Sequence, residues 1–408
     1  MVSENNSNKE NPSGFRNVTA LGIVSFFTDF STEMVLGILP FFIVNTLGIS
    51  KALFGVIEGS SEFTSYAFRM VSGTLSDKLG KRKIFVLAGY GISTVSKPFF
   101  SIASGWLDSF LIRNGDRIGK GLRTAPRDAL IADSVSEPRV GRAFGIHRTI
   151  DQMGAIVGPF AAFALLQVMD IRGIFLVSLI PGAIAVLVLV FFVKEIATRK
   201  RANNSILSNI GGVIRNNRPF VFLLIVSGLF SLGAFNFSFV LLKASDLGVE
   251  KNFIPLVYAI INVAHTVIGI PAGILSDKIG REKVLLISYG VFVISSILMI
   301  ALSGNALYAY VLAIIFGLYL GISETVQRAV IPRYVSSDLR GTAFGAFNLA
   351  YGSSFFVSNV VFGFLWDSYS LTSAVSYSIS MTIIAICGLF VLIKKYPINN
   401  LTSSNTQK

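Results

Sequence analysis

Ionisable side chains lie inside long apolar runs of this chain, where a charge is expensive. An unpaired charge at the centre of a bilayer costs about 2.5 to 3.5 kcal/mol even on the most lenient scales, so charges kept there face protein or water and usually have a function. The second half holds three, Lys243, Glu324 and Arg328. The first half holds fifteen, namely Asp29, Glu33, Glu58, Glu62, Arg69, Lys97, Arg113, Asp116, Arg117, Lys120, Arg123, Arg127, Asp128, Arg148 and Asp151. The polar chemistry is therefore predicted to belong to the first half.

Two pairs of acids have a spacing that suits proton binding. Asp29 and Glu33 are four residues apart, as are Glu58 and Glu62, so each pair shares one face of a helix. Burial raises the pKa of a carboxyl group and a nearby arginine lowers it, so a cationic helix that moves past such a group loads and releases a proton. Asp29 and Glu33 are the predicted proton-coupling residues, with Glu58 or Glu62 as the alternative.

A basic stripe follows one side of a later helix. Arg113, Arg117, Lys120 and Arg127 step by four, three and seven residues, and Asp116 lies among them. Two roles stay open for the stripe, since it can neutralise the buried acids or bind an anionic group of a substrate. The alternative to both is an ion-pair network that only holds the helices together.

The second half of the chain offers fewer candidate polar residues. Glu324 and Arg328 are four residues apart and are predicted to pair, which makes them the secondary site candidates and the one plausible ionic contact from the second half. His265 stands among apolar residues and is most simply a packed, hydrogen-bonded histidine.

A second histidine belongs to a polar cluster. His147, Arg148 and Asp151 fall at the start of an apolar run, with His147 and Asp151 one helical turn apart. A proton relay fits this spacing, but a charged cap at the membrane surface is the favoured interpretation.

The sequence shows no group of residues suited to catalysis by a metal or a thiol. The chain has two histidines and a single cysteine, Cys387, which excludes an internal disulfide and a cysteine-based metal or redox site. No Gly-x-x-x-x-Gly-Lys-Ser/Thr phosphate loop is present. The sequence predicts no enzyme activity, no metal site and no cofactor.

The elements that position these groups are membrane helices. Apolar residues make up 52% of the 408 residues and charged ones 14%, against about a quarter in soluble domains. The apolar residues form runs of about twenty, long enough to cross a bilayer. Twelve helices are predicted, over 18–47, 53–75, 84–105, 107–132, 142–168, 171–193, 219–243, 253–275, 284–303, 306–332, 341–366 and 370–393.

The distribution of basic residues predicts the orientation. One side of the membrane, which also holds both termini, carries 22 of the 35 Lys and Arg residues, and the other side carries three. Basic loops stay in the cytoplasm, so both termini are expected there, in a cell membrane. The net charge of +13 then reflects topology rather than a nucleic-acid partner. The polar first residues do not resemble a removable signal peptide.

This topology divides the chain into five parts. A cytoplasmic tail is predicted over 1–17 and a six-helix bundle over 18–193. A basic cytoplasmic linker, 194–218, joins it to a second six-helix bundle, 219–393, and 394–408 forms the other tail. A polar linker of this length suits two bundles that move against each other.

The two bundles are copies of one unit at an offset of 200 residues. Gly121 recurs as Gly321 at the same offset. The longer matches are Gly73, Leu75, Ser76, Asp77, Lys78 and Gly80 with Gly273, Leu275, Ser276, Asp277, Lys278 and Gly280, and Gly141, Ala143, Phe144 and Gly145 with Gly341, Ala343, Phe344 and Gly345. A duplicated membrane protein of this size indicates a transporter.

The first of these segments, Gly73-x-Leu75-x-Asp77-Lys78-x-Gly80-Lys81-Arg82-Lys83, resembles the signature loop of the major facilitator superfamily. The resemblance implies two six-helix bundles around a central cavity that opens to either side in turn. It also implies that the loop latches the cytoplasmic side. The candidate gating residues are Gly73, Asp77, Gly80, Arg82, Gly273, Asp277, Gly280 and Lys283, although Glu282 replaces Arg82 in the second copy and weakens that latch.

Two shorter patterns resemble family motifs in part. Arg117-x-x-x-Gly121 is similar to the motif associated with proton transfer. Gly154-x-x-x-Gly158-Pro159 is similar to the signature of proton-exchanging exporters, without its later glycines. Close packing of two helices is the alternative role of this second pattern.

The resemblance also predicts what surrounds the cavity. The first, fourth and seventh helices line it in the family, so Asp29 and Glu33 are expected to face the basic stripe. The seventh helix is crowded with Phe230, Phe235, Phe237 and Phe239. These rings suit a partly hydrophobic substrate, and lipid-facing filler is the alternative.

The sequence thus predicts a proton-coupled secondary transporter of a small organic molecule, working by alternating access, with export favoured. An uptake carrier for an anionic nutrient or a metal chelate is the alternative within transport. A transporter-like sensor is the alternative of another class. The expected partners are the substrate, protons and the bilayer, with no nucleic acid, and the expected state is a monomer.

Overall fold

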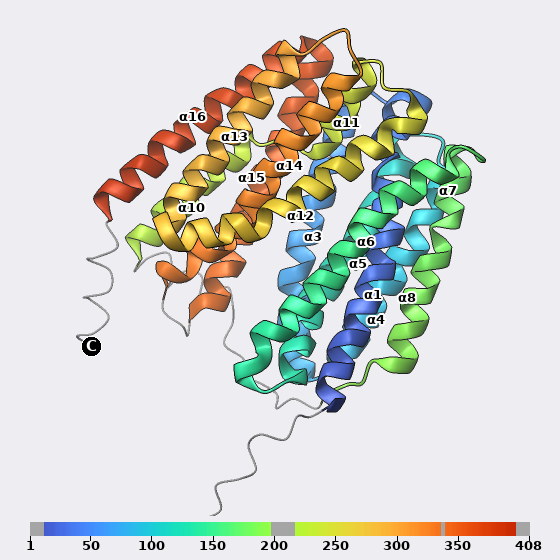
Figure 1. The fold of residues 1–408 in the computed structure, drawn as a ribbon, viewed down its shortest axis with the longest axis vertical. Coiled ribbons are helices and arrows are strands. Elements are labelled where there is room, and N and C mark those ends of the chain that lie inside the picture. The colour runs from blue at the N-terminus through green and yellow to red at the C-terminus, as the bar shows by residue number, and fades with distance from the viewer. Residues whose placement is uncertain (1–11, 197–216, 336–338, 397–408) are drawn as a thin grey trace, which may run out of the picture.

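The computed structural model describes residues 12–196, 217–335 and 339–396, and within these ranges it contains helices and no strand. The helices of the first half of the chain lie together, and those of the second half form a second group beside them (Figure 1). The all-α architecture expected from the sequence is confirmed.

The first group contains six membrane spans, three of them interrupted. Span one is α1, α2 and a short π-helix, span three ends in the 3₁₀ helix η2, and span six is divided into α7 and α8. The bounds are α1 (Pro12–Leu36), α2 (Leu39–Phe41), η1 (Phe42–Thr46), α3 (Lys51–Leu79), α4 (Arg82–Ser96), η2 (Lys97–Ser101), α5 (Trp106–Ser134), η3 (Glu137–Arg139), α6 (Val140–Leu165), α7 (Ile171–Val177) and α8 (Leu179–Phe192).

The second group repeats this order. Its first span is divided into α10 and α11, and its fourth ends in a 3₁₀ turn. The bounds are α10 (Arg218–Gly233), α11 (Phe237–Asp246), η4 (Lys251–Phe253), α12 (Ile254–Ile279), α13 (Arg281–Ala301), α14 (Leu307–Val330), η5 (Ile331–Arg333), α15 (Arg340–Ser368) and α16 (Leu371–Lys395).

The helices of the first bundle are less apolar than those of the second, because most of the buried charges lie in the first. Eight spans in the described part are long and apolar enough to cross a membrane, and they include all six of the second group. The other four are α3, α5 and α6, which carry most of the buried charges, and α4, which is 15 residues long. Their polar groups must therefore face protein or water rather than lipid.

Two helix interruptions have identifiable causes. Pro98 follows Lys97 and cannot donate a backbone hydrogen bond, so α4 changes to a 3₁₀ turn there. Between α10 and α11 the backbone N–H of Asn236 donates to Asn359 Oδ1 on α15 at 3.0 Å. This contact satisfies a group that a broken membrane helix would otherwise leave unpaired.

The two bundles pack together at one end. A Cβ on Gly55 of α3 would lie 2.2 Å from the carbonyl oxygen of Asn359, and one on Gly363 of α15 would lie 2.4 Å from that of Lys51. Phe163 and Phe253 also meet there, with ring centroids 5.4 Å apart. We call this the opposite end, because the basic loops 77–83 and 277–283 lie at the other, which we call the basic end.

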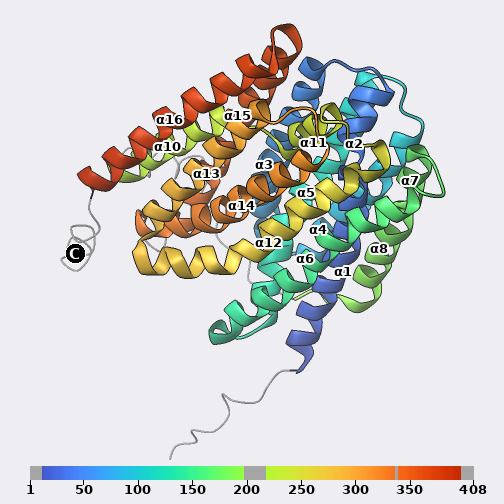
Figure 2. The same cartoon turned by 45° about the horizontal axis from the view of Figure 1, so that its top comes forward.

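The bundles are separated at the basic end. The apolar core that crosses between them runs through residues of the opposite end, while a smaller core around Val18 and Val86 stays inside the first bundle. Added Cβ atoms on the repeated glycines near the starts of α6 and α15 would meet nothing within 4 Å; these are Gly141, Gly145, Gly341 and Gly345. α6 and α12 contact each other toward the opposite end and diverge toward the basic end (Figure 2).

The helix ends cross the predicted domain boundaries by one or two residues at Arg218 and Lys395, and by more at the start of α1. α1 begins at Pro12, inside the segment predicted as the tail 1–17. Proline is common at the first position of a helix, where its fixed backbone angle suits the helix and its missing N–H costs nothing. Most of the predicted linker, 197–216, and the tail from 397 lie outside the described residues, so the division into domains stays a prediction.

Candidate functional site

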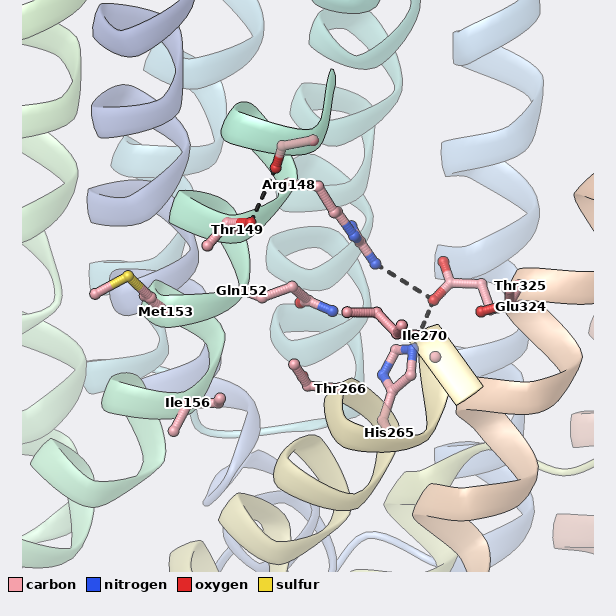
Figure 3. Close-up of a pocket in the computed structure, with 12 residues that line it drawn as sticks. Arg148, Thr149, Gln152, Met153, Ile156, His265, Thr266, Ile270, Glu324 and Thr325 are labelled. Atoms are coloured by element: carbon pink, nitrogen blue, oxygen red, sulfur yellow. Dashed lines mark hydrogen bonds and ion pairs between the residues drawn. The ribbon is translucent and has the colours of Figure 1, made fainter. Parts of the chain in front are cut away.

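Two adjoining recesses lie between the bundles. The central recess, about 270 Å³, is bounded by α3 on one side. On the other side it is bounded by the break between α10 and α11 and by α11, α12, α14 and α15. The lateral recess, about 560 Å³, lies between α6, α12 and α14 (Figure 3). Both are lined by His265 and Glu324, so these two side chains mark their junction.

Aromatic side chains of the second bundle form much of the central recess. Phe235, Phe237, Tyr319, Tyr351 and Phe355 line it. Of the four phenylalanines predicted for this wall, Phe235 and Phe237 take part, while Phe230 and Phe239 are buried in the core of the second bundle. None of the four is exposed, so the lipid-facing interpretation is wrong.

The basic stripe is largely covered by carboxylates of the neighbouring helix. Arg113 of α5 donates two hydrogen bonds of 2.9 Å to Glu58 of α3, and each side chain is 1% exposed. Arg117 contacts Glu62 at 3.0 Å. In this conformation the two arginines balance buried acids, which favours the first of the two roles left open by the sequence.

The remaining members of the stripe differ from one another. Asp116 accepts a 2.5 Å hydrogen bond from Ser93 and lies 3.5 Å from Arg113. Arg127 contacts the adjacent Asp128 at 2.9 Å. Lys120 is half-buried and forms no ion pair with the described residues.

The closest contacts of the two acids of α1 lie outside the stripe. Glu33 accepts a short hydrogen bond from Tyr258 of α12 in the second bundle and lies 3.4 Å from the Nδ2 of Asn262. Asp29 lies close to Asp151 of α6.

Stripe residues do face the acids of α1, since Lys120 interacts electrostatically with both and Arg117 with Glu33. The direct ion pairs with the stripe, however, are made by the other acids, Glu58 and Glu62.

One ion pair joins the bundles in the described part of the chain. Arg148 Nη1 lies 3.0 Å from Asp151 Oδ2, and its Nη2 lies 3.5 Å from Glu324 Oε2. Glu324 also contacts His265 Nε2 at 2.8 Å, as Figure 3 shows. His265 is therefore hydrogen-bonded, as predicted, but its neighbours are not all apolar. The side chain of Arg328, the partner predicted for Glu324, lies outside the described residues.

The predicted surface cap at the start of α6 is instead an internal network. His147 and Asp151 are both buried. His147 Nε2 lies 2.9 Å from Ser25 Oγ on α1, which in turn lies 2.9 Å from the hydroxyl of Tyr90 on α4. The cap interpretation is wrong because this turn of α6 packs against α1 instead of ending at the membrane surface.

Both basic loops turn at a left-handed glycine. Gly80 has a φ of 65° and Gly280 a φ of 103°, a region that side chains other than glycine rarely adopt. Gly73 approaches α5 closely, since an added Cβ would lie 3.2 Å from Ala125, whereas Gly273 has ordinary contacts. The two copies thus share the turn but not the packing.

The ion pairs of the loops stay inside their own bundles. Arg82 pairs closely with Asp133 and lies 3.3 Å from Asp77. At the positions 200 residues later, Glu282 lies 2.8 Å from Arg333, so the second copy keeps the pair with its charges exchanged.

Two of the candidate gating residues make no close ion pair with the described residues in this conformation. Asp277 lies 3.7 Å from Arg281, and Lys283 is exposed. The latch between bundles stays a prediction for a conformation closed at the basic end.

The Gly154-x-x-x-Gly158-Pro159 segment packs α6 against α1. Added Cβ atoms would lie 2.3 Å from the carbonyl oxygen of Phe26 at Gly154 and 2.8 Å from that of Phe30 at Gly158. Small residues let membrane helices approach in this way. The geometry supports the packing role and brings Asp151 of α6 beside α1.

Several polar residues of the site were not among the predicted site residues. Tyr258 and Asn262 lie one turn apart on α12 and both approach Glu33. Lys97, 1% exposed, donates to Thr32 of α1 at 3.1 Å. Polar residues one turn apart in an apolar run are a signal that could have identified the pair on α12.

Sequence comparisons agree with this architecture. A sequence model of the major facilitator superfamily matches residues 21–358 and 221–408. An uncharacterized MFS-type transporter of Methanocaldococcus jannaschii is 33% identical over 409 residues, covering 96% of this chain and 98% of its own. The multidrug resistance protein MdtH of Blochmanniella pennsylvanica is 23% identical and covers 95% of both chains.

Solved structures show the same fold at low identity. A variant of the nucleoside transporter NupG has a TM-score of 0.77 with 15% identity, covering 93% of this chain and 99% of its own. A POT family transporter in complex with 5-aminolevulinic acid has a TM-score of 0.78 with 13% identity, covering 94% and 96%. With two repeated six-helix bundles around central recesses, this chain belongs to the major facilitator superfamily.

Proposed function

We propose that this membrane transporter exports a small organic molecule in exchange for protons, and that the molecule is a lipophilic cation. The observation that carries the proposal is the lining of the central recess. Among the described residues, its ionisable side chains other than tyrosine are Glu62, Glu324 and His265, with no Lys or Arg. Rings of tyrosine and phenylalanine complete the wall, and aromatic faces attract cations.

The distribution of exposed charge supports a cation over an anion. The side chain of Glu324 is 40% exposed and that of Glu62 is 19% exposed, while Arg117 is 2% exposed. An anion would have to displace the Glu62 carboxylate from Arg117 before it could bind there. Uptake of an anionic nutrient or metal chelate is therefore the weaker candidate.

Export is supported by the relatives and by the expected orientation. The relative named multidrug resistance protein covers nearly the whole chain. A multi-drug resistance efflux pump of Streptococcus pneumoniae is 27% identical over 175 residues. With the basic end in the cytoplasm, the recesses are open to the compartment from which an exporter takes its substrate.

Tetraphenylphosphonium and tetraphenylborate, two ions of nearly equal shape and opposite charge, test the substrate class. We expect the cation to stabilise the purified protein against thermal unfolding, by about 2.7 kcal/mol at a hundred times its dissociation constant. Tetraphenylborate is expected to have no effect. Glu324→Gln should weaken binding of the cation, whereas Glu250→Gln, at an exposed outer position, should not.

The same assay separates the alternatives. Stabilisation by anions that disappears in the double variant Arg117→Gln, Lys120→Gln, compared with the ligand-free variant, would support the anion carrier and contradict our proposal. Counterflow of bound cation in proteoliposomes then distinguishes a transporter from a sensor. A protein that binds the cation without counterflow would be a sensor.

Alternating access predicts a role for the uncovered glycines. Gly145 and Gly345 lie at equivalent positions of α6 and α15, in open space in this conformation. We expect them to be covered when the basic end closes. The variant Gly145→Leu, Gly345→Leu should keep cation binding and abolish counterflow. Gly91→Leu, also in open space but on α4, is the matched control. Full counterflow in the double variant would show that these faces do not close.

A further inference from the structure

A chain of polar contacts connects the interior of the first bundle with the substrate recess. Asp29 of α1 lies close to Asp151 of α6. Asp151 lies 3.0 Å from Arg148, which reaches 3.5 Å across the interface to Glu324 of α14. Glu324 in turn contacts His265. One arginine is thus shared between an acid of the first bundle and an acid of the second.

The proximity of Asp29 and Asp151 favours a shared proton. A carboxylate has no hydrogen to donate, so a hydrogen bond between two carboxyl groups forms only when one of them is protonated. Asp151 is 3% exposed and is held beside α1 by the close packing of Gly154 on Phe26. Two carboxylates held together this way repel each other when both are ionised, which favours binding of one proton.

Other charged groups surround the pair without connecting it to an acid of the second bundle. Arg127 of α5 and His147 of α6 are the nearest neighbours of Asp151 besides Arg148. The groups that face Asp29 are Glu33 on its own helix, Lys97 in η2, and Lys120 and Arg123 on α5. Among the ion pairs between described residues, the one that joins the two bundles is Arg148 with Glu324.

We infer that Arg148 is a switch that exchanges between Asp151 and Glu324 according to whether the Asp29–Asp151 pair holds a proton. With the proton bound, the pair carries one negative charge and Arg148 is shared with Glu324. When the proton leaves to water in the open recess, the pair carries two negative charges and draws Arg148 to Asp151. Glu324 then loses one cationic partner on the recess wall.

The switch would couple one proton to one cation in the proposed export. It rests on that proposal only for the identity of the substrate. One proton leaves the first bundle as one positive charge is withdrawn from Glu324, so a cationic ligand takes the place of the guanidinium. Rebinding of a proton returns Arg148 to Glu324 and expels the cation. Arg148 is a positioning residue in this scheme, since the proton binds elsewhere.

A distance measurement tests the switch without any substrate. Spin labels on Lys78→Cys and Lys278→Cys, exposed and equivalent positions at the basic end, report its opening in a Cys387→Ser background. The bridge between Arg148 and Glu324 is made in the open conformation, so lowering the pH should enrich the long-distance population. We expect the ratio of populations to change about 5- to 150-fold across the titration.

Variants assign the effect to the proposed groups. Asp29→Asn, Asp151→Asn and Arg148→Gln should each make the ratio independent of pH, and Arg148→Lys should restore part of the dependence. Arg142→Gln, exposed on the same helix, should change nothing. Because Arg148 is 47% exposed, its replacement leaves the fold intact. His265→Gln should keep the dependence, since His265 is the other titratable partner of Glu324 and is not the proposed sensor.

Two results with variants would overturn the inference, as would one with the wild-type protein. One is a pH-dependent ratio that survives Arg148→Gln, and the other is a dependence that His265→Gln abolishes. A pH-independent wild-type protein would do the same. Failure of tetraphenylphosphonium to bind would refute the proposed substrate and leave this measurement unaffected, so the two proposals fail separately.

Discussion

Arg113→Met is expected to lower the free energy of unfolding by about 3 to 5 kcal/mol. Arg113 and Glu58 are each 1% exposed and are joined by two hydrogen bonds of 2.9 Å. Removing the arginine leaves the carboxylate buried without its partner, and that uncompensated charge accounts for the cost. Unfolding of the purified protein in mixed micelles with increasing denaturing detergent, followed by circular dichroism, measures the change.

The double variant Arg113→Met, Glu58→Leu tests the cause. Apolar residues of similar volume often replace a buried pair at little cost, so most of the stability should return. Arg142→Met removes an exposed arginine and should change the stability by about 0.5 kcal/mol or less. A double variant as unstable as the single one would show that the stability depends on the shape of these side chains rather than on an unpaired charge.

The fold followed from features that the sequence displays directly. Runs of about twenty apolar residues and an offset of 200 between equivalent loops were enough to predict two six-helix bundles. The interruption at Asn236 was not predicted, because the contact that stabilises it comes from Asn359, 123 residues away. Periodicity identifies a helix and its polar face. It does not reveal which distant residue hydrogen-bonds to the backbone where the helix is interrupted.

The sequence predicted which charged residues share a helix face, but it did not predict which residues they contact. The spacing placed Glu58 with Glu62 and Arg113 with Arg117, yet only the packing of α3 against α5 shows that these faces meet. The family resemblance placed α1 opposite the stripe, where Lys120 does interact with both acids of that helix, but it did not identify α3 as the source of the direct ion pairs. A carboxylate pair on one helix face can contact any neighbouring helix, so spacing alone leaves the choice open.

The structure separates Asp29 from Glu33, which the sequence treated as one proton-coupling pair. Asp29 contacts Asp151 within the first bundle, whereas Glu33 accepts a hydrogen bond from Tyr258 of the second. A glutamine at position 33 can still accept that hydrogen bond, because its side-chain carbonyl oxygen occupies the same place. An asparagine at position 29 cannot exchange a proton with Asp151. The two substitutions should therefore have different effects.

We expect Asp29→Asn to reduce efflux of tetraphenylphosphonium driven by a pH gradient by about 5- to 150-fold, the range of a typical coupling free energy. Glu33→Gln should retain most of it, and Glu33→Leu, which loses the hydrogen bond from Tyr258, should fall between the two. Efflux from proteoliposomes with an imposed pH gradient measures all three, and counterflow without a gradient controls for binding. If the double variant Asp29→Asn, Glu33→Gln still transports normally, neither acid of α1 couples protons. If Glu33→Gln alone abolishes pH-driven efflux, coupling belongs to the bundle interface rather than to the Asp29–Asp151 pair.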